Sequence, residues 1–328
     1  MAVYTDIDER ELADFLARYP VGELLSYRGI AEGVENSNFL IHATDAAYIL
    51  TLFERRVAEH DLPFFLGLKK HLAANGFGCP HPIERTGEAG EGAMLGRLAG
   101  RPAALVSFLE GVWLRRPTPA HCREAGTAMA RLHEGGADFP MRRANALGPG
   151  AWASLYEAAG PDAPNVAEGL AETVETALRE VERGWPTGLP AGIVHADYFP
   201  DNVFFLHDRV SGVIDFYFAA NDQLAYDIAI ALLAWCHERD GMFNATKGRA
   251  FLAGYESVRR LGPDEAEALP VLARGAALRF MLTRLYDWLH VPGDGLVVKK
   301  DPAEYLAKLR HHANVTSAAE YGLIREAA

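Results

Sequence analysis

The chain has 328 residues, of which 49% are hydrophobic and 23% charged, and its formal net charge is −12. This composition is ordinary for a folded protein, and the length is sufficient for two domains or lobes. The acidic balance argues against a nucleic-acid partner and against an anionic membrane surface, because both attract basic surfaces, but it is compatible with a cationic or zwitterionic substrate.

The N-terminal segment is acidic and amphipathic and lacks the apolar core of a signal peptide. No apolar run in the sequence is long enough to span a bilayer. The cysteines, Cys79, Cys122 and Cys236, lie far apart and form no C-x-x-C pair, so we expect buried thiols rather than a zinc site or a disulfide framework. These features predict a protein of the reducing cytoplasm, and they set no expectation for its oligomeric state.

Residues 1–110 are predicted to form an antiparallel sheet lobe. A short helix is expected around residues 8–17, and runs of β-forming residues follow at 36–41 and 48–53. Asp61 and Pro63 then begin a helix that ends near Asn75 and Gly76, because Asp is a good N-cap and Gly a good C-cap. The later strands of this lobe are expected near residues 83, 94–95 and 103–109.

Residues 111–328 are predicted to form a larger, mainly helical lobe. Helical periodicity covers residues 122–133, 166–183, 224–237, 249–260, 264–289 and 303–312. The exception is the segment 192–216, where short β-rich runs alternate with polar turns, so that its polar residues lie on loops at strand ends. Residues 141–164 are rich in Gly, Pro and Ala and are expected to form a loop or an insertion.

The segment 195–215 contains the pattern of a kinase catalytic loop. His195, Asp197 and Asn202 match the spacing H-x-D-x-x-x-x-N, and Asp215 follows the next predicted strand, where kinases place a metal-binding acid. In such a loop, Asp197 would receive or orient the hydroxyl of the attacking substrate. Asn202 and Asp215 would hold Mg²⁺ against the nucleotide phosphates, because hard cations prefer oxygen ligands. The pattern therefore predicts phosphoryl transfer from Mg·ATP.

Each of these residues could also serve a purely structural purpose. Asp197 and Asp201 could be turn formers and Asn202 could cap a strand, but the combined spacing favours the catalytic interpretation. His195 is expected to orient the loop through hydrogen bonds rather than to react. A zinc site recruiting His195, His207 and His237 fits no compact ligand spacing. Asp227, near the start of an apolar helix, is expected to brace the catalytic loop.

Two segments of the sheet lobe are candidates for nucleotide binding. Residues 29–38 place Gly33, Asn36, Ser37 and Asn38 between two predicted strands, where a flap could cover phosphates with backbone N–H groups. An ordinary hairpin turn would have the same composition. Phe108 and Leu109 lie at the boundary between the lobes, where a hinge could offer backbone groups and an apolar wall to adenine, or could serve only as a linker.

The acceptor side is expected near the helix at residues 264–289. Arg284 and Asp287 share a stripe with aromatic residues at helical spacing, and this stripe could bind the carboxylate and the ammonium of an amino acid. A surface Arg284–Asp287 pair would produce the same pattern. Tyr217 and Asn221, just after Asp215, are further candidates for acceptor binding.

At this point the sequence resembles the aminoglycoside-phosphotransferase-like kinase superfamily, and within it the bacterial homoserine kinases of that fold. The resemblance extends from about residue 21 to 323, and its segments are HADYFPDN, IDF in place of DFG, YDIA, MARLH, GVENSNF, ILTLFE, DLPFF and ALRFMLTRLYDWL. It implies a two-lobed, protein-kinase-like α+β fold and ATP-dependent phosphorylation of the L-homoserine hydroxyl in threonine biosynthesis. The same fold could instead serve choline, an aminoglycoside or another hydroxylated metabolite.

The sequence departs from the kinase pattern in one place. Such kinases carry a phosphate-binding Lys on the third strand, paired with a helix Glu, whereas Thr51 stands at the strand position here and the helix after it contains no Glu. The cations that could replace the Lys are Arg28, Arg55, Arg56 and Lys69. A non-catalytic nucleotide-binding protein is the remaining alternative, and the intact Asp197, Asn202 and Asp215 argue against it.

Overall fold

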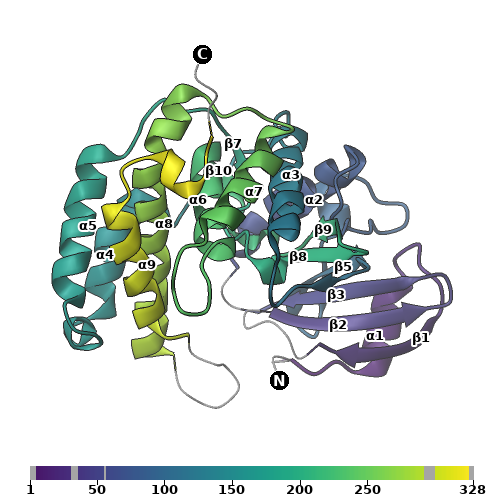
Figure 1. The fold of residues 1–328 in the computed structure, drawn as a ribbon. Coiled ribbons are helices and arrows are strands. Elements are labelled where there is room, and N and C mark those ends of the chain that lie inside the picture. The colour runs from purple at the N-terminus through teal and green to yellow at the C-terminus, as the bar shows by residue number, and fades with distance from the viewer. Residues whose placement is uncertain (1–4, 31–35, 55–56, 292–299, 325–328) are drawn as a thin grey trace.

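The computed structural model describes residues 5–30, 36–54, 57–291 and 300–324. It has two lobes (Figure 1), a smaller one built on an antiparallel sheet and a larger one that is mainly helical. The two predicted lobes therefore appear in the structure as an α+β arrangement. In the described part of the chain, no helix has both the length and the apolar character needed to cross a membrane.

The smaller lobe is a five-stranded sheet with the spatial order β1-β2-β3-β5-β4 and antiparallel pairing throughout. Its strands are β1 (Leu24–Gly29), β2 (Asn36–Ala43), β3 (Ala47–Phe53), β4 (Gly96–Leu98) and β5 (Arg101–Ser107). Helix α1 (Glu9–Leu16), capped by the Asp8 side chain, buries Leu12 and Phe15 against Ile41 and Leu50 of the sheet. Alternation along the strands thus gives one face to α1, whereas Phe53 and Ala104 of the opposite face belong to the core of the larger lobe.

Helix α2 (Leu62–Ala74) links the two lobes. It ends as predicted at Asn75, followed by Gly76 in the left-handed region at φ +78°. The predicted side-chain cap is wrong, because the Asp61 carboxylate accepts hydrogen bonds from Arg143 and caps no backbone N–H of the helix. The apolar residues of α2 join the core of the larger lobe rather than the core beneath α1.

The larger lobe is organised around one long helix. Its helices are α3 (Pro119–Gly135), α4 (Pro149–Ala159), α5 (Leu170–Gly184), α6 (Leu224–Trp235), α7 (Ala245–Glu256), α8 (Pro263–His290) and α9 (Pro302–Asn314). Helix α8 packs against α4, α5, α6 and α9 and is buried along most of its length. Together, α4, α5, α8 and α9 form the end of the molecule that lies away from the sheet lobe (Figure 1).

Helix α4 corrects the expectation of a loop at residues 141–164. Pro149 and Gly150 misled the sequence interpretation, but they occupy the first turn, where Pro costs no hydrogen bond. The helix is anchored by Trp152, which is 1% exposed and donates a hydrogen bond from Nε1 to the Leu147 carbonyl.

Short strands in the larger lobe carry the loops of interest. They are β6 (Val112–Trp113), β7 (Ala191–Val194), β8 (Val203–Leu206), β9 (Arg209–Val213) and β10 (Ala220–Gln223). The predicted hairpin is confirmed as β8 and β9, and β6 adds to its edge. Strand β7 pairs with β10, so the segment 195–202 after β7 and the segment 214–219 before β10 are held side by side. This pairing fixes the two halves of the predicted catalytic motif relative to each other.

Candidate active site

The loop after β7 has a strained backbone that two buried charges hold in place. Ala196 lies in the left-handed region at φ +61°, a conformation that costs energy for a residue other than glycine. The Asp227 carboxylate accepts hydrogen bonds from the His195 N–H at 2.7 Å and the Ala196 N–H at 2.8 Å. On the other side, Arg279 Nη1 donates to the Ala196 carbonyl. The loop is therefore held at Ala196 by hydrogen bonds to both its N–H and its carbonyl group.

The Asp227 carboxylate is completely buried, and both of its oxygen atoms have hydrogen-bond partners. Besides the two backbone N–H groups, its Oδ2 atom lies 3.1 Å from His133 Nε2, and His133 Nδ1 lies 2.7 Å from the Tyr255 hydroxyl. Burial alone would raise the pKa of Asp227, but the hydrogen bonds from the His133 side chain and the His195 backbone hold that pKa below its ordinary value. The expectation that Asp227 braces the catalytic loop is confirmed.

His195 links the two segments of the motif. Its Nδ1 atom accepts a hydrogen bond from the Asp197 N–H at 3.3 Å, so Nε2 carries the proton and donates it to the Ile214 carbonyl at 2.9 Å. Burial lowers the pKa of His195, which favours this neutral form. The imidazole thus ties the loop of Asp197 to the residue before Asp215, as expected for an orienting role.

Asp197 and Asn202 are joined directly. Asn202 Nδ2 donates to the Asp197 carbonyl at 2.9 Å and to its Oδ2 at 3.1 Å, which directs the amide oxygen away from this pair. Burial raises the pKa of Asp197, and the Arg279 guanidinium opposes the rise. The Asn202 carbonyl also accepts from the Ile214 N–H at 2.9 Å. Asp215 follows with an exposed side chain at φ +61°, so an amide oxygen and a carboxylate stand on adjoining loops. This donor set suits a hard cation.

The residues predicted to bind the nucleotide lie in two places. Asn36, Ser37 and Asn38 are at the end of the β2–β3 hairpin opposite its turn, and Phe108 and Leu109 are in the hinge. Gly33 is outside the described residues. The Asn36 Oδ1 atom accepts from the Glu54 N–H, and the Ser37 hydroxyl donates to the Glu54 carboxylate at 2.7 Å. Asn38 pairs with Thr51 across the strands, and the Thr51 hydroxyl donates to Asn38 Oδ1 at 2.8 Å.

The hinge begins directly after β5. Phe108 is 44% exposed, and its N–H donates to the Ala47 carbonyl at 3.3 Å, which attaches the hinge to the sheet. The Leu109 side chain closely approaches Gly212 of the hairpin. These two residues therefore contact both lobes, and their role in binding adenine stays a prediction.

Tyr217 and Asn221 lie outside the lining of the pocket beside the loop of Asp197, and acceptor binding by them stays a prediction. The Tyr217 ring packs edge-on against Phe53 and Phe65, on the side of the sheet lobe. Asn221 Oδ1 accepts from the Arg143 N–H at 2.8 Å, and its own N–H donates to the Arg143 carbonyl at 2.7 Å. Neither residue lines the pocket beside the catalytic loop, so the structure gives both a packing or bridging position.

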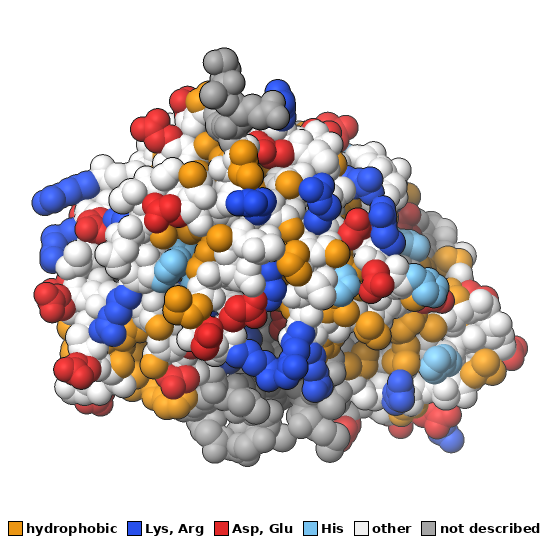
Figure 2. Space-filling view, in the orientation of Figure 1, with side chains coloured by type: hydrophobic (Ala, Val, Ile, Leu, Met, Phe, Trp, Pro, Cys, Tyr) orange, Lys and Arg blue, Asp and Glu red, His pale blue; other side chains and the backbone are white. Residues whose placement is uncertain are grey.

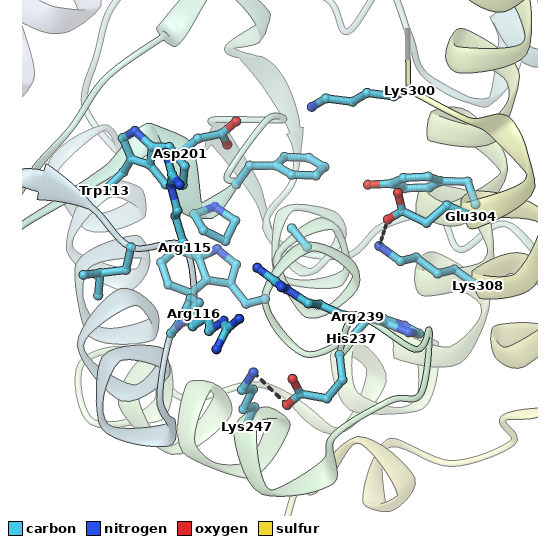
Figure 3. Close-up of a pocket in the computed structure, with 18 of the residues that line it drawn as sticks. Trp113, Arg115, Arg116, Asp201, His237, Arg239, Lys247, Lys300, Glu304 and Lys308 are labelled. Carbon is cyan, nitrogen blue, oxygen red and sulfur yellow. Dashed lines mark ion pairs between the residues drawn. The ribbon is translucent and has the colours of Figure 1, made fainter. Parts of the chain in front are cut away.

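That pocket has a volume of about 940 Å³ and begins at the catalytic loop (Figure 3). Its charged lining residues are Arg115, Arg116, Asp201, Glu238, Arg239, Asp240, Lys247, Arg284, Lys300, Glu304 and Lys308. Seven are cations and four are carboxylates, so the lining is net positive in a chain whose net charge is −12. Figure 2 shows Lys and Arg side chains gathered around a hollow in the lower middle of the face. Such a lining favours an anionic group in the ligand.

The pocket lies beside the loop that carries Asp197, and its lining includes Phe199, Pro200 and Asp201. Two lining residues act electrostatically on Asp197, although less than burial and Arg279 do: the charge of Asp201 raises the pKa of the Asp197 carboxyl group, and the charge of Lys300 lowers it. Arg284 lines the pocket with its guanidinium 3.9 Å from the Tyr305 ring centroid, and it lies 3.6 Å from the Glu304 carboxylate. Asp287 is not among the lining residues. The structure thus pairs Arg284 with Glu304 of α9, a partner that was not visible from its own helix, and amino-acid binding by Arg284 and Asp287 together stays a prediction.

A sequence model of the phosphotransferase enzyme family matches residues 26–261, more than half of the chain. The chain therefore belongs to the phosphotransferase enzyme family. Similar full-length proteins include the homoserine kinases of Sinorhizobium fredii, at 61% identity, and of Rhizobium meliloti, at 60%. Both alignments cover 100% of this chain and 99% of the relative. Within the family, the chain belongs with these homoserine kinases.

Solved structures support the fold. An amicoumacin kinase matches with a TM-score of 0.71 and 14% identity, covering 95% of each chain. A microcompartment-associated aminopropanol kinase matches with a TM-score of 0.65 and 18% identity, covering 93% of this chain and 95% of the other. At these identities the likeness concerns the fold alone, and the expected two-lobed, protein-kinase-like fold is confirmed.

Proposed function

We propose that the chain transfers the γ-phosphoryl group of ATP to the side-chain hydroxyl of L-homoserine, giving O-phospho-L-homoserine for threonine biosynthesis. The observation that carries this proposal is the full-length identity of about 60% to homoserine kinases, combined with Asp197, Asn202 and Asp215 on adjoining loops. Buried thiols suit a reducing compartment, so the proposal includes a cytoplasmic setting.

In the proposed reaction, Asp197 orients the acceptor hydroxyl and accepts its proton. The raised pKa of Asp197 makes it a stronger base than an exposed carboxylate. Asn202 and Asp215 would hold Mg²⁺, which when bound neutralises charge on the nucleotide phosphates. His195 and Asp227 fix the positions of these groups. Catalysis then rests on positioning and charge stabilisation, without a covalent enzyme intermediate.

The nucleotide is proposed to bind in the cleft between residues 1–110, the nucleotide-binding lobe, and residues 111–328, the catalytic and acceptor-binding lobe. Asn36, Ser37 and Asn38 would shape the phosphate end of the flap that contains Gly33. The hinge at Phe108 and Leu109 would hold the adenine, because an exposed aromatic side chain and an apolar one border it.

The acceptor is proposed to bind in the basic pocket. Arg284 would bind the carboxylate, since a guanidinium matches carboxylate geometry and this one is already oriented by Tyr305. Asp201, whose charge acts on Asp197, would attract the ammonium. Both groups line the pocket beside the loop that carries Asp197. Asp201 also acts electrostatically on Asp197, so one small amino acid would meet both groups with its hydroxyl directed toward Asp197.

The Arg284→Met variant is therefore expected to raise the KM for homoserine by about 10-fold or more, the loss of a charge-assisted hydrogen bond, with little change in the KM for ATP. Steady-state kinetics with each substrate varied in turn would measure this. Arg183→Met, on the exposed last turn of α5, is the matched control and should behave as wild type. An unchanged KM for homoserine would contradict the assignment of Arg284.

An acceptor panel tests the function itself. ADP release would be measured with L-homoserine, L-serine, L-threonine, choline and an aminoglycoside at equal concentrations. We expect the highest kcat/KM with L-homoserine, because a basic lining disfavours cationic acceptors that have no carboxylate. A higher kcat/KM with choline or an aminoglycoside would reject homoserine as the acceptor. Binding of ATP with no turnover of any acceptor would indicate a non-catalytic protein.

A further inference from the structure

Strand β3 offers no cation to the nucleotide. Thr51 occupies the position of the usual phosphate-binding Lys, and its hydroxyl is already engaged with Asn38 at 2.8 Å. Of the cations considered from the sequence, Arg55 and Arg56 lie outside the described residues. Arg28 is exposed on β1, the edge strand of the sheet. Lys69 on α2 remains, and its surroundings are unusual for a lysine.

Lys69 occupies a core position of its helix. It is 5% exposed, on the same face as Phe65 and Leu72, which are four residues before and three residues after it. Its neighbour Lys70 shows the ordinary arrangement, with an exposed ammonium 2.7 Å from Glu84. In the parts of the chain that the structure describes, the Lys69 ammonium makes no hydrogen bond or ion pair. Burying a cation without such partners costs free energy. A ligand that supplies negative charge would offset this cost.

The Lys69 ammonium lies beside the segment that follows Asp215. It lies 5.4 Å from the ring centroid of Tyr217, two residues after Asp215, and it interacts electrostatically with Asp215. The Tyr217 hydroxyl in turn contacts the Thr51 side chain. Thr51, Tyr217, Lys69 and Asp215 therefore form one cluster, in which the cation neighbours both the strand position that lacks a Lys, through Tyr217, and the acid assigned to Mg²⁺.

Burial lowers the pKa of Lys69 to about 8, and the nearby Cys79 and Asp215 oppose this shift. A group with that pKa is still mainly cationic at pH 7. The usual arrangement needs two residues, a strand Lys and a helix Glu that orients it. Here the helix contributes a Lys itself, and no Glu is present on α2.

We infer that Lys69 supplies, from α2, the cation for the nucleotide phosphates that strand β3 lacks at Thr51. This inference rests on the proposed function in so far as the ligand is ATP. It makes Lys69 a binding residue for the β- and γ-phosphates, and it assigns to a helix the charge that this fold ordinarily places on a strand.

The test compares Lys69→Met with Lys70→Met, which removes the adjacent but exposed charge. Calorimetry with Mg²⁺ would measure affinity for adenosine, ADP and a non-hydrolysable ATP analogue. For Lys69→Met we expect a loss of about 10- to 100-fold for the ATP analogue, the range for a charge-assisted contact, and unchanged affinity for adenosine. Lys70→Met should bind all three ligands as wild type does. Lys69→Arg, which keeps the cation, should bind the ATP analogue more tightly than Lys69→Met.

Wild-type affinity of Lys69→Met for the ATP analogue would overturn the inference. An equal loss for adenosine and the ATP analogue would also overturn it, because that result indicates a general distortion of the cleft. The binding measurements need no acceptor, so they separate this inference from the proposed function. A wild-type protein that binds ATP but does not phosphorylate homoserine would reject only the acceptor, whereas one that binds no ATP would reject both.

Discussion

The Asp197→Asn variant is expected to have a kcat about 100- to 10,000-fold below that of the wild type, the range for losing a positioned general base. Asn keeps the size of the side chain but cannot accept the hydroxyl proton. Because the proposal assigns neither the nucleotide nor Mg²⁺ to Asp197, affinity for ATP should change little. Steady-state kinetics combined with calorimetric titration of an ATP analogue would separate the two effects.

Asp208→Asn is a suitable control for this variant. Asp208 lies in the exposed turn between β8 and β9 at φ +60°, a conformation that Asn also tolerates, and in the described structure its side chain contacts His121, away from the catalytic loop. Its kcat should equal that of the wild type. Wild-type turnover in Asp197→Asn would remove Asp197 from the catalytic role. A parallel loss of ATP affinity would instead indicate that the loop had moved.

The Asp227→Ala variant is expected to lower the free energy of unfolding by about 3–5 kcal/mol, as found when one partner of a buried ion pair is removed. The change leaves the His195 and Ala196 N–H groups and His133 without their buried acceptor. The strained Ala196 backbone would also lose one of its two clamps. Urea denaturation at pH 7, followed by circular dichroism, would measure the change.

Asp264→Ala is the matched control, since Asp264 is also an acid in the first turn of a helix but is exposed. Its removal should cost less than about 1 kcal/mol, the usual size of a helix-dipole contribution. If Asp227→Ala had the same free energy of unfolding as Asp264→Ala, the hydrogen bonds of Asp227 would not be what holds the loop. A folded Asp227→Ala variant with wild-type kcat would lead to the same conclusion.

The catalytic motif could be predicted from the sequence because its chemistry is local. Asp197, Asn202 and Asp215 must follow strands at fixed spacing. The β-rich runs between Asn202 and Asp215 indicate the hairpin that separates them. The role of Asp227 was also accessible, since an acid in the first turn of so apolar a helix is costly unless it binds nearby donors. Its partnership with His133 depends on how α3 and α6 pack together, and residue spacing along the chain does not show which distant helices meet.

The acceptor side was less predictable for the same reason. Arg284 and Asp287 share a helical stripe, but of the two only Arg284 lines the pocket bounded by α9, and residue spacing along α8 does not show where α9 packs. Tyr217 follows Asp215 closely in sequence, yet a left-handed residue at Asp215 and the turn after it direct the ring toward Phe53. Tertiary packing decided both positions.

The most direct test of the central proposal is the identity of the product. Wild-type protein would be incubated with ATP, Mg²⁺ and L-homoserine, and the products would be followed by ³¹P nuclear magnetic resonance and mass spectrometry. We predict a phosphate monoester on the side-chain oxygen of homoserine, formed in equal amount to ADP and absent with Asp197→Asn. ADP formation without phosphorylated homoserine, or the same yield of ester from Asp197→Asn, would contradict the proposal.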